Sequence, residues 1–322
     1  MTSNILYIFT RTPLHVGAGA SVGAIDQPIQ RERHTGFPII PASSLKGSFA
    51  DQWPVTLRNS ERELVRVTSK KVGDKYEVDQ IDSSGAAWLF GSDDAHVSFA
   101  GSLNFSEARV LAFPIRSAKG SYAWITCPLM LQRAKRDGVI TGRIPKEPKD
   151  DEAIFNSEGP LALPAQVKGV DRIQVVLEEY TFTHSDTYPD SLAQELAELL
   201  EDELFKSIAD RLVILSNGMM SHFVSTTCEI AQHVRISDET GTAEDGGLFN
   251  QENVPSETLF YSVLTATKSH VLTGELKDKP IAEAIASFAA KLMEAHYTFQ
   301  FGGNASTGLG YCTVTLNETK GA

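Results

Sequence analysis

Prolines and glycines interrupt the first forty residues so often that only a short strand and a long irregular loop can form there. Residues 4–12 are rich in β-branched and aromatic side chains, which predicts a strand ending at Pro13. The stretch LHVGAGASVGAID follows. Pro28, Pro38 and Pro41 then prevent a continuous helix, because proline has no amide hydrogen to donate inside one. This segment therefore predicts a strand, a long loop and only then a helix.

Three segments carry the apolar spacing of helices. Leu45, Phe49 and Trp53 recur at helical intervals, and Ser43 or Ser44 could cap that helix. A second pattern starts near Ser191 and continues through LAQELAELLEDELFKSIADRL. A third helix is predicted to begin at Pro280. Its apolar face consists of Ile281, Ala284, Ile285, Phe288, Leu292 and His296.

Strand-like segments alternate with these helices. Residues 233–255 predict a hairpin, since Thr-Gly and Gly-Gly lie between two extended runs. Residues 59–85 are polar and predict a surface insertion, and residues 133–160 predict a mobile loop. The C-terminal part predicts a strand, the loop GGNASTGLG and a final strand. Together these features indicate an α+β fold, an antiparallel sheet with helices packed on one face.

The composition is that of one elaborated globular domain, residues 1–322, with 42% hydrophobic and 22% charged residues. The N-terminus lacks the pattern of a signal peptide, and no apolar stretch reaches the roughly 18 residues that cross a bilayer. We expect a soluble, cytoplasmic protein with no membrane partner. Cys127, Cys228 and Cys312 stand alone, which predicts reduced, buried thiols and no zinc site.

The net charge of −12 argues against nucleic-acid binding over the whole surface, because phosphates attract basic side chains. The charge is unevenly distributed, however. The first fifty residues hold four basic side chains, in addition to two acidic ones, Asp26 and Glu32. The four are Arg11, Arg31, Arg33 and Lys46. The sequence therefore permits a basic strip that binds RNA on an otherwise acidic protein.

Two glycine-rich loops allow different interpretations. Neither the loop 17–23 nor the loop 302–310 joins a strand directly to a helix, and neither ends in Gly-Lys-Ser/Thr, so a dinucleotide or ATP site is disfavoured. Both could simply be tight connections that need positive φ angles. Alternatively, the bare backbone N–H groups face the phosphates of an extended RNA. Ser43, Ser44 and Lys46 at the start of a helix would suit the same ligand, or be an ordinary helix start.

Asp26 is a carboxylate within this basic strip, beside loops that could hold RNA. It could hold Mg²⁺ or orient an attacking 2′-hydroxyl, or it could cap its own turn. His15 and His34 could serve acid–base chemistry, although a lone histidine is more often a hydrogen-bonding residue.

The string RTPLHVGAGASVGAIDQPIQRERHTGFPIIPASSLKGSFAD resembles the N-terminal signature of RAMP proteins, most closely the backbone subunits of type III-B CRISPR effectors. The stretches SEARVLAFPIRSAKGSYAWITCPLML, LFNQENVPSETLFYSVL and FGGNASTGLGY agree with it. The resemblance implies a ferredoxin-like palm, similar to an RNA-recognition motif, with insertions. It also implies a thumb hairpin, here residues 233–255, that inserts between guide and target RNA and flips a base pair out.

The same resemblance implies roles for particular residues. Asp26 matches the family's cleavage residue, and a divalent ion, Mg²⁺ or Mn²⁺, is expected at Asp26, with His15 as a further catalytic residue. The expected partners are guide RNA (crRNA), target RNA, head-to-tail copies of the chain and other effector subunits. The residues expected to contact RNA are Gly17, Gly19, Arg31, Arg33, Ser43, Ser44, Lys46, Gly302, Gly303, Asn304 and Gly308.

Three alternatives remain open. The chain could package guide RNA while another subunit cuts the target. It could be a metal-independent endoribonuclease that matures precursor guide RNA, using His15 or His34. A nucleotide-binding enzyme is the third alternative, which the loop positions disfavour.

Overall fold

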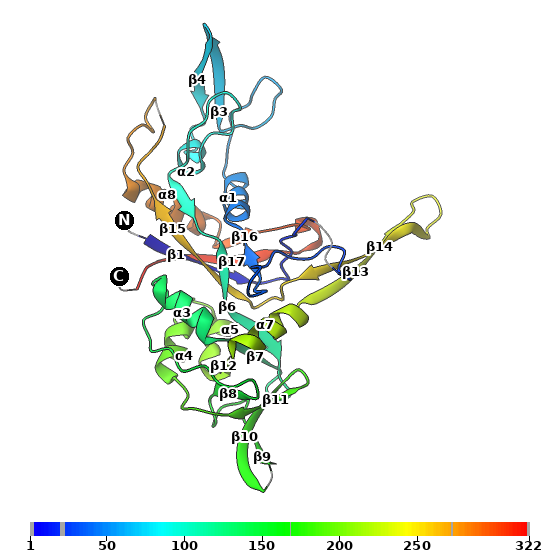
Figure 1. Ribbon diagram of the computed structural model, residues 1–322. Coiled ribbons are helices and arrows are strands. Elements are labelled where there is room, and N and C mark those ends of the chain that lie inside the picture. Colours follow the sequence, from blue (N-terminus) through cyan, green and yellow to red (C-terminus); the bar gives the residue numbers. More distant parts are fainter. Residues whose placement is uncertain (1–2, 20–22, 168, 272, 321–322) are drawn as a thin grey trace.

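A large mixed sheet is the main feature of the computed structural model, which describes residues 3–19, 23–167, 169–271 and 273–320 (Figure 1). It contains 13 strands within the described residues. The strands are β1 (Ser3–Thr10), β2 (Ile39–Ile40), β5 (Leu103–Phe105), β6 (Ala108–Arg116), β7 (Tyr122–Thr126), β8 (Glu152–Phe155), β9 (Leu163–Val167), β10 (Val170–Leu177), β11 (Tyr180–His184), β12 (Leu212–Ile214), β15 (Leu259–Ala266), β16 (Thr298–Gln300) and β17 (Tyr311–Glu318).

Strand β1 lies in the interior of this sheet, between two strands from the C-terminal part of the chain. It pairs antiparallel with β15 on one side and with β17 on the other, so that Tyr7 faces both Tyr261 and Thr315. Its side chains alternate between two cores. Leu6 and Ile8 belong to one core, whereas Ile5, Tyr7 and Phe9 belong to the other. Because side chains on both faces of β1 are buried, this strand anchors the first residues of the loop that follows it.

Helices cover both faces of the central strands. The helices are α1 (Ala42–Asp51), α2 (Ala86–Phe90), α3 (Pro128–Arg136), α4 (Asp190–Ala197), α5 (Glu203–Lys206), α6 (Ile208–Arg211), α7 (Asn217–Thr226) and α8 (Ile281–Glu294). On one face, the ring of Phe49 in α1 lies 5.0 Å from that of Phe288 in α8. On the other face, Phe9 of β1 lies 5.2 Å from Phe205 of α5.

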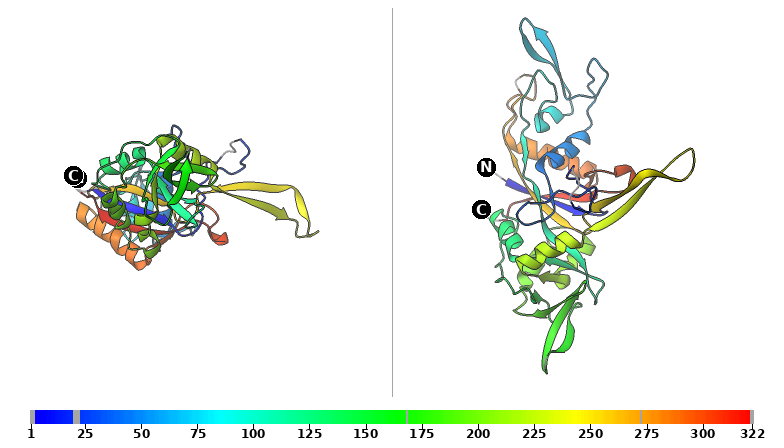
Figure 2. Two further views of the ribbon diagram at one scale, coloured as in Figure 1. Left: turned by 90° about the horizontal axis from the view of Figure 1, so that it is seen from below. Right: turned by 45° about the vertical axis from the view of Figure 1, so that its right-hand side comes forward.

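Three hairpins project from the body of the molecule (Figures 1 and 2). They are β3 (Val67–Val72) with β4 (Lys75–Ile81), β9 with β10, and β13 (Glu229–Ile236) with β14 (Ala243–Asn253). The first lies within the insertion predicted at 59–85. The third is the hairpin predicted at 233–255, and it begins earlier, at Glu229.

The α+β class is confirmed, with two differences in detail. The predicted sheet had helices on one face, whereas α4–α6 cover the second face as well. The pairing is mostly antiparallel, but β12 runs parallel to β7 and β11 parallel to β8. Cys127, Cys228 and Cys312 are free and buried, as predicted. None of the helices in the described residues is long and apolar enough to span a membrane.

Four local predictions were wrong. Helix α1 begins after Pro41, and no serine side chain caps it. The pattern starting near Ser191 forms three short helices, because Asp202 caps a new helix by accepting a hydrogen bond from the Phe205 N–H. Residues 133–160 are not one loop: α3 extends to Arg136, and β8 lies inside the sheet. In α8, Ile281 is exposed, and His296 lies beyond the last helical residue.

Candidate nucleic-acid interface

The loop after β1 and the C-terminal glycine loop lie against each other. The Gly303 N–H donates to the His15 carbonyl at 2.9 Å, and the Gly310 N–H donates to the Pro13 carbonyl at 2.8 Å. A Cβ atom on Gly302 would lie 2.1 Å from the His15 carbonyl oxygen, and the φ of Gly302 is +73°. Glycine is therefore required here for close approach of two backbones. The two loops are therefore in direct contact.

Several of the remaining glycines leave backbone at the surface. Gly17, Gly19, Gly303 and Gly308 are exposed. Gly19 and Gly308 have φ angles of +85° and +89°, and a Cβ on either would meet nothing within 4 Å. The positive φ angles thus explain part of the glycine content. The main chain at these exposed glycines is also accessible to a ligand.

Asp26 lies on the surface at the base of the β13–β14 hairpin. Its backbone N–H donates to Oδ1 of Asn250 at 2.8 Å, and its carboxylate Oδ2 accepts from the Asn250 N–H at 2.9 Å. The next residue, Gln27, pairs in a parallel bridge with Gln251. The Asp26 loop therefore extends the edge of β14, although the two segments are more than two hundred residues apart in sequence.

His15 and Arg31 converge on a second residue of β14, Glu252, whose side chain is 3% exposed. His15 donates through Nδ1 to the Glu252 carbonyl at 2.7 Å, which leaves only Nε2 for any further contact. Arg31 contacts the Glu252 carboxylate at 2.5 Å and donates to the carbonyls of Gly36 and Val224. The guanidinium of Arg31 is thus largely occupied by protein groups.

The start of α1 is open. Ser43 is exposed, Ser44 and Lys46 are partly exposed, and no side chain caps the first turn. Lys46 forms no ion pair with any described residue. The other end of α1 contacts the C-terminal region, since Gln52 donates through Nε2 to the Gln300 carbonyl at 3.1 Å.

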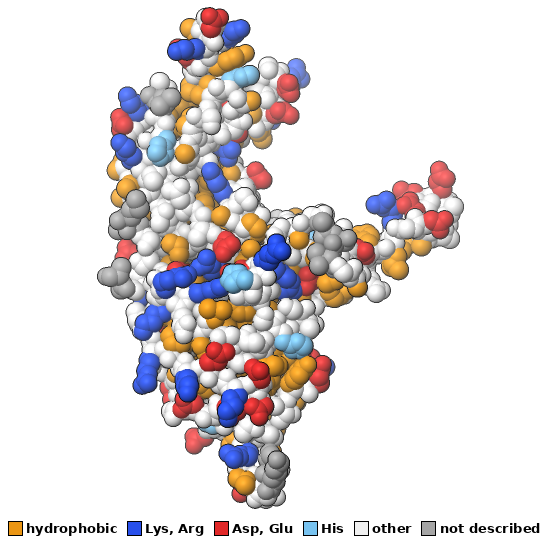
Figure 3. Space-filling model, viewed as in Figure 1, with side chains coloured by type: hydrophobic (Ala, Val, Ile, Leu, Met, Phe, Trp, Pro, Cys, Tyr) orange, Lys and Arg blue, Asp and Glu red, His pale blue; other side chains and the backbone are white. Residues whose placement is uncertain are grey.

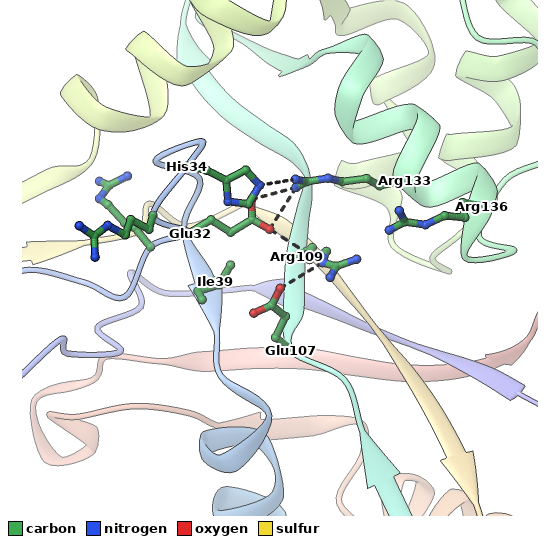
Figure 4. Close-up of a pocket in the computed structure, with 9 residues that line it drawn as sticks. Glu32, His34, Ile39, Glu107, Arg109, Arg133 and Arg136 are labelled. Atoms are coloured by element: carbon green, nitrogen blue, oxygen red, sulfur yellow. Dashed lines mark hydrogen bonds and ion pairs between the residues drawn. The ribbon is translucent and has the colours of Figure 1, made fainter.

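An arginine-rich cavity of about 500 Å³ lies between β2, β6 and α3 (Figure 4). Figure 4 shows His34 and Glu32 pointing toward Arg133 from the opposite wall. The cavity is lined by Arg31, Glu32, Arg33, His34, Ile39, Glu107, Arg109, Arg133 and Arg136. On this face of the molecule, basic side chains gather across the middle of the body, while acidic ones gather at the tip of the β13–β14 hairpin (Figure 3).

Glu32 is the centre of the cavity's hydrogen bonds. Its carboxylate accepts from Thr35 at 2.6 Å and from Arg133 at 2.9 and 3.0 Å. Burial by itself would raise the pKa of Glu32, but the hydrogen bonds from Thr35 and Arg133 hold this pKa below its ordinary value. Arg133 also lies 3.1 Å from Nε2 of His34, which must accept that hydrogen bond. Arg33 is exposed and forms no ion pair with the described residues.

A protein-only metal site is absent from the described part of the chain, which holds no group of three or more His, Cys, Asp or Glu side chains suited to an ion. Asp26 belongs to no such group among the described residues. Mg²⁺ is often held by only one or two carboxylates together with substrate phosphates. The donors around Asp26 fit that kind of ion site and do not fit a closed protein cage.

Sequence reasoning missed the contribution of β14. Gln251, Glu252 and Asn253 are all buried, with exposures of 0%, 3% and 2%. Asn250, Glu252, Arg109 and Arg133 were not among the predicted site residues. The sequence shows only that NQEN is a run of four polar residues just before Val254. The structure buries three of them, and buried polar groups need partners.

Comparisons with known proteins agree on one family. The model of the RAMP superfamily matches residues 8–313. The Cmr endoribonuclease Cmr4 of the CRISPR system of Pyrococcus furiosus is 32% identical over 326 residues, 99% of this chain and 97% of that protein. The CRISPR endoribonuclease Csm3 of Streptococcus thermophilus is 37% identical over 100 residues, 30% of this chain and 39% of Csm3.

Solved structures show the same fold. A crystal structure of oligomeric Cmr4 from Pyrococcus furiosus has a TM-score of 0.62 and 26% identity, covering 99% of this chain and 98% of that one. A type III-B Cmr-beta structure bound to cognate target RNA has a TM-score of 0.64 and 19% identity, covering 98% of this chain and 97% of that one.

Proposed function

Because this chain belongs to the RAMP superfamily, we propose that it is a cytoplasmic, repeating backbone subunit of a type III-B CRISPR ribonucleoprotein and that it cuts target RNA through Asp26. Similarity along nearly the whole chain to an endoribonuclease of a CRISPR Cmr system supports both parts. In this proposal, copies of the chain stack head to tail along the guide RNA, with other effector subunits beside them. The oligomeric state of a solved relative is consistent with such stacking.

The observation that carries the proposal is the convergence of three distant segments beside Asp26. The loop holding His15, the loop holding Gly302 and the end of β14 meet at one place, and the β13–β14 hairpin projects from it. An RNA strand bound along these loops would pass Asp26 and meet the hairpin. That arrangement suits cutting at a fixed position relative to each copy.

In this proposal the RNA track has two parts. The glycine loops let phosphates approach the main chain closely, and the contributing residues are Gly17, Gly19, Gly302, Gly303, Asn304 and Gly308. The N–H groups of Gly303 and Gly308 already donate to the His15 and Ala305 carbonyls, so these two glycines contribute space for the RNA backbone and not a hydrogen bond. Asn304 is held in place by donating to the Gln251 side chain at 2.7 Å. The second part is the open start of α1, where Ser43, Ser44 and Lys46 offer donors and a positive charge to another phosphate.

The two arginines of the N-terminal strip receive different roles. Arg33 is exposed and has no carboxylate partner among the described residues, so it is free to contact a phosphate. Arg31 acts on the RNA through its charge and not through a direct hydrogen bond. Its guanidinium already donates to the Glu252 carboxylate and to backbone carbonyls.

The chemistry is a transesterification within the target strand. The 2′-oxygen next to the cut bonds to phosphorus as the bond from phosphorus to the 5′-oxygen breaks, which leaves a cyclic phosphate and a 5′-hydroxyl end. The Asp26 carboxylate orients the 2′-hydroxyl and receives its proton. Nε2 of His15 is the ring nitrogen left to donate a proton to the leaving 5′-oxygen, because Nδ1 donates to the Glu252 carbonyl.

A divalent ion, Mg²⁺ or Mn²⁺, belongs to this proposal. When bound by Asp26 and RNA phosphates, it would supply positive charge near the reacting phosphate. Asp26 is the one protein carboxylate proposed to hold it.

The test is an Asp26→Ala variant assembled with guide RNA and complementary target. We expect cutting to stop at every regular position while guide content and target affinity stay unchanged. Asp186→Ala removes another exposed carboxylate, outside the β13–β14 hairpin and the glycine loops, and serves as the matched control. Continued cutting by Asp26→Ala would mean that the chain is a scaffold and another subunit cuts. Cutting that survives EDTA and needs His15 or His34 would favour a metal-independent ribonuclease.

A further inference from the structure

We propose that Asn250 of β14 is a positioning residue that holds Asp26 in its cutting position and connects it to the β13–β14 hairpin. This inference rests on the cleavage role proposed for Asp26. It adds a residue that the sequence analysis did not select and that lies 224 positions further along the chain.

Backbone hydrogen bonds between Gln27 and β14 hold the chain just after Asp26, but they do not orient the Asp26 carboxylate. The Asp26 side chain is exposed, so packing does not hold it, and its loop belongs to no helix or named strand. Nearby Gly23 has a φ of +63° and would meet nothing within 4 Å if it carried a Cβ. A carboxylate on such a loop depends on hydrogen bonds for its orientation.

Asn250 supplies those hydrogen bonds with its side chain and its backbone together. Its Oδ1 accepts from the Asp26 N–H at 2.8 Å, and its own N–H donates to Oδ2 of Asp26 at 2.9 Å. Its Nδ2 donates to the Ala24 carbonyl at 3.0 Å. The two residues therefore bond reciprocally, and a third bond holds the chain two residues before Asp26.

This arrangement leaves one carboxylate oxygen for RNA. Oδ2 of Asp26 is engaged by Asn250, whereas Oδ1 makes no hydrogen bond with any described residue. The reciprocal pair thus fixes the rotation of the carboxylate and turns one oxygen outward. Displacing a reacting group by about 1 Å can slow a reaction by about a hundredfold, so this rotation matters.

Asn250 also lies where the hairpin leaves the body. Gln251 beside it is fully buried, whereas Leu248, two residues toward the tip, is 69% exposed. The hairpin beyond this point projects away from the body (Figure 2). RNA that displaces the projecting part would therefore move Asn250 and, through it, Asp26. The hydrogen bonds between Asn250 and Asp26 therefore make the position of the Asp26 carboxylate depend on RNA binding to the β13–β14 hairpin.

The experiment compares Asn250→Ala with Gln232→Ala in the assembled complex. Gln232 is the exposed amide opposite Asn250 in the hairpin, and its side chain makes no hydrogen bond with the described residues. Asn250→Ala removes the side-chain bonds to the Asp26 N–H and the Ala24 carbonyl, while the backbone N–H of residue 250 can still donate to Oδ2 of Asp26. Because the Asp26 backbone loses these anchors, we expect the single-turnover cleavage rate to fall about 10- to 100-fold, with guide content and target affinity within about twofold of the parent. Amide exchange in residues 23–30 should become faster in Asn250→Ala only.

Asn250→Ser tests rescue, because its hydroxyl can still accept a hydrogen bond. We expect a cleavage rate between those of the parent and Asn250→Ala. If Asn250→Ala fails to assemble, Asn250→Ser must still cut at least about threefold more slowly than Gln232→Ser at equal target affinity.

A cleavage rate in Asn250→Ala equal to the parent's, while Asp26→Ala is inactive, overturns this inference and leaves the proposed function standing. Cutting by Asp26→Ala removes both.

Discussion

At the scale of residues, neighbouring side chains of one type have different surroundings. Arg31 and Arg33 were predicted together as RNA contacts because both are cations in a basic strip. The structure holds Arg31 against Glu252, which lies 221 residues away, and leaves Arg33 exposed. Nothing near Arg31 in the sequence indicates this partner. The pairing exists only because β14 returns to the loop that follows β1.

Glu257 allows a prediction about pH. It precedes β15, is half-buried and has a φ of +65°. Burial, and then the charge of Asp202, raise the pKa of Glu257 to about 7. Because the folded-state pKa lies above the unfolded value, ionisation opposes folding. This cost is absent below about pH 4, and it grows as pH rises to 7 and beyond.

Glu257→Gln should therefore stabilise the protein at pH 8, by about 1 kcal/mol after allowance for solvent screening, and change little at pH 4. Urea denaturation at both pH values measures the effect. Glu203→Gln is the control, because this carboxylate is exposed and pairs with Lys206. Equal stability of parent and Glu257→Gln at pH 8 would contradict the prediction.

Sequence reasoning selected candidate residues in the N-terminal strip but not the residues that contact them. His15 and Asp26 were selected because their residue types stood out beside glycines and prolines. Asn250 and Glu252 were not, because an asparagine and a glutamate in a strand look like surface residues. The bonding of both residues, and the burial of Glu252, depend on contacts over more than 220 positions, which local patterns do not contain.

At the scale of elements, the sequence predicted those helices and strands whose ends are marked by nearby residues. The final helix and the two strands around the C-terminal loop were predicted because proline, glycine and apolar spacing mark their ends. The pattern after Ser191 was predicted as one helix because its apolar spacing continues. Tertiary packing of Leu199 and Leu200, both buried, ends α4 where the spacing does not.

The C-terminal loop allows a comparison of two glycines. Gly302 has positive φ, and a Cβ there would also overlap the His15 carbonyl, whereas Gly308 has positive φ and free space. Gly308→Ala should cost about 1 kcal/mol of unfolding free energy from the backbone conformation alone. Gly302→Ala should cost about 3 kcal/mol or more, because the two loops must also separate.

Urea denaturation of both variants measures the difference, and Gly308→Ala is the matched control for positive φ. Gly302→Ala should also loosen the loop that carries His15, which amide exchange would show. Equal losses of stability in the two variants would mean that the contact between the loops contributes nothing to stability.

At the scale of the whole molecule, charge is separated rather than balanced. The chain carries a net charge of −12, yet basic side chains lie across the middle of one face and acidic ones at the tip of a projecting hairpin (Figure 3). Total charge therefore predicts nothing about RNA binding for this fold. The sequence only permitted a basic strip. The structure places Arg31 and Arg33 around one cavity together with Arg109, Arg133 and Arg136, which are distant in sequence.

RNA held by phosphate contacts should bind more weakly as salt rises, with a slope of about −0.7 in log affinity per log salt for each neutralised phosphate of a single strand. Lys46→Gln and Arg33→Gln should each make the slope for guide RNA shallower by about 0.7, because each removes one cation without a carboxylate partner among the described residues. Lys206→Gln, which removes a cation paired with Glu203, should leave the slope unchanged. The slopes are obtained by measuring RNA affinity between about 50 and 300 mM salt, where log affinity falls linearly with log salt. An unchanged slope in Lys46→Gln would show that the start of α1 holds no phosphate, and the track would then be confined to the glycine loops.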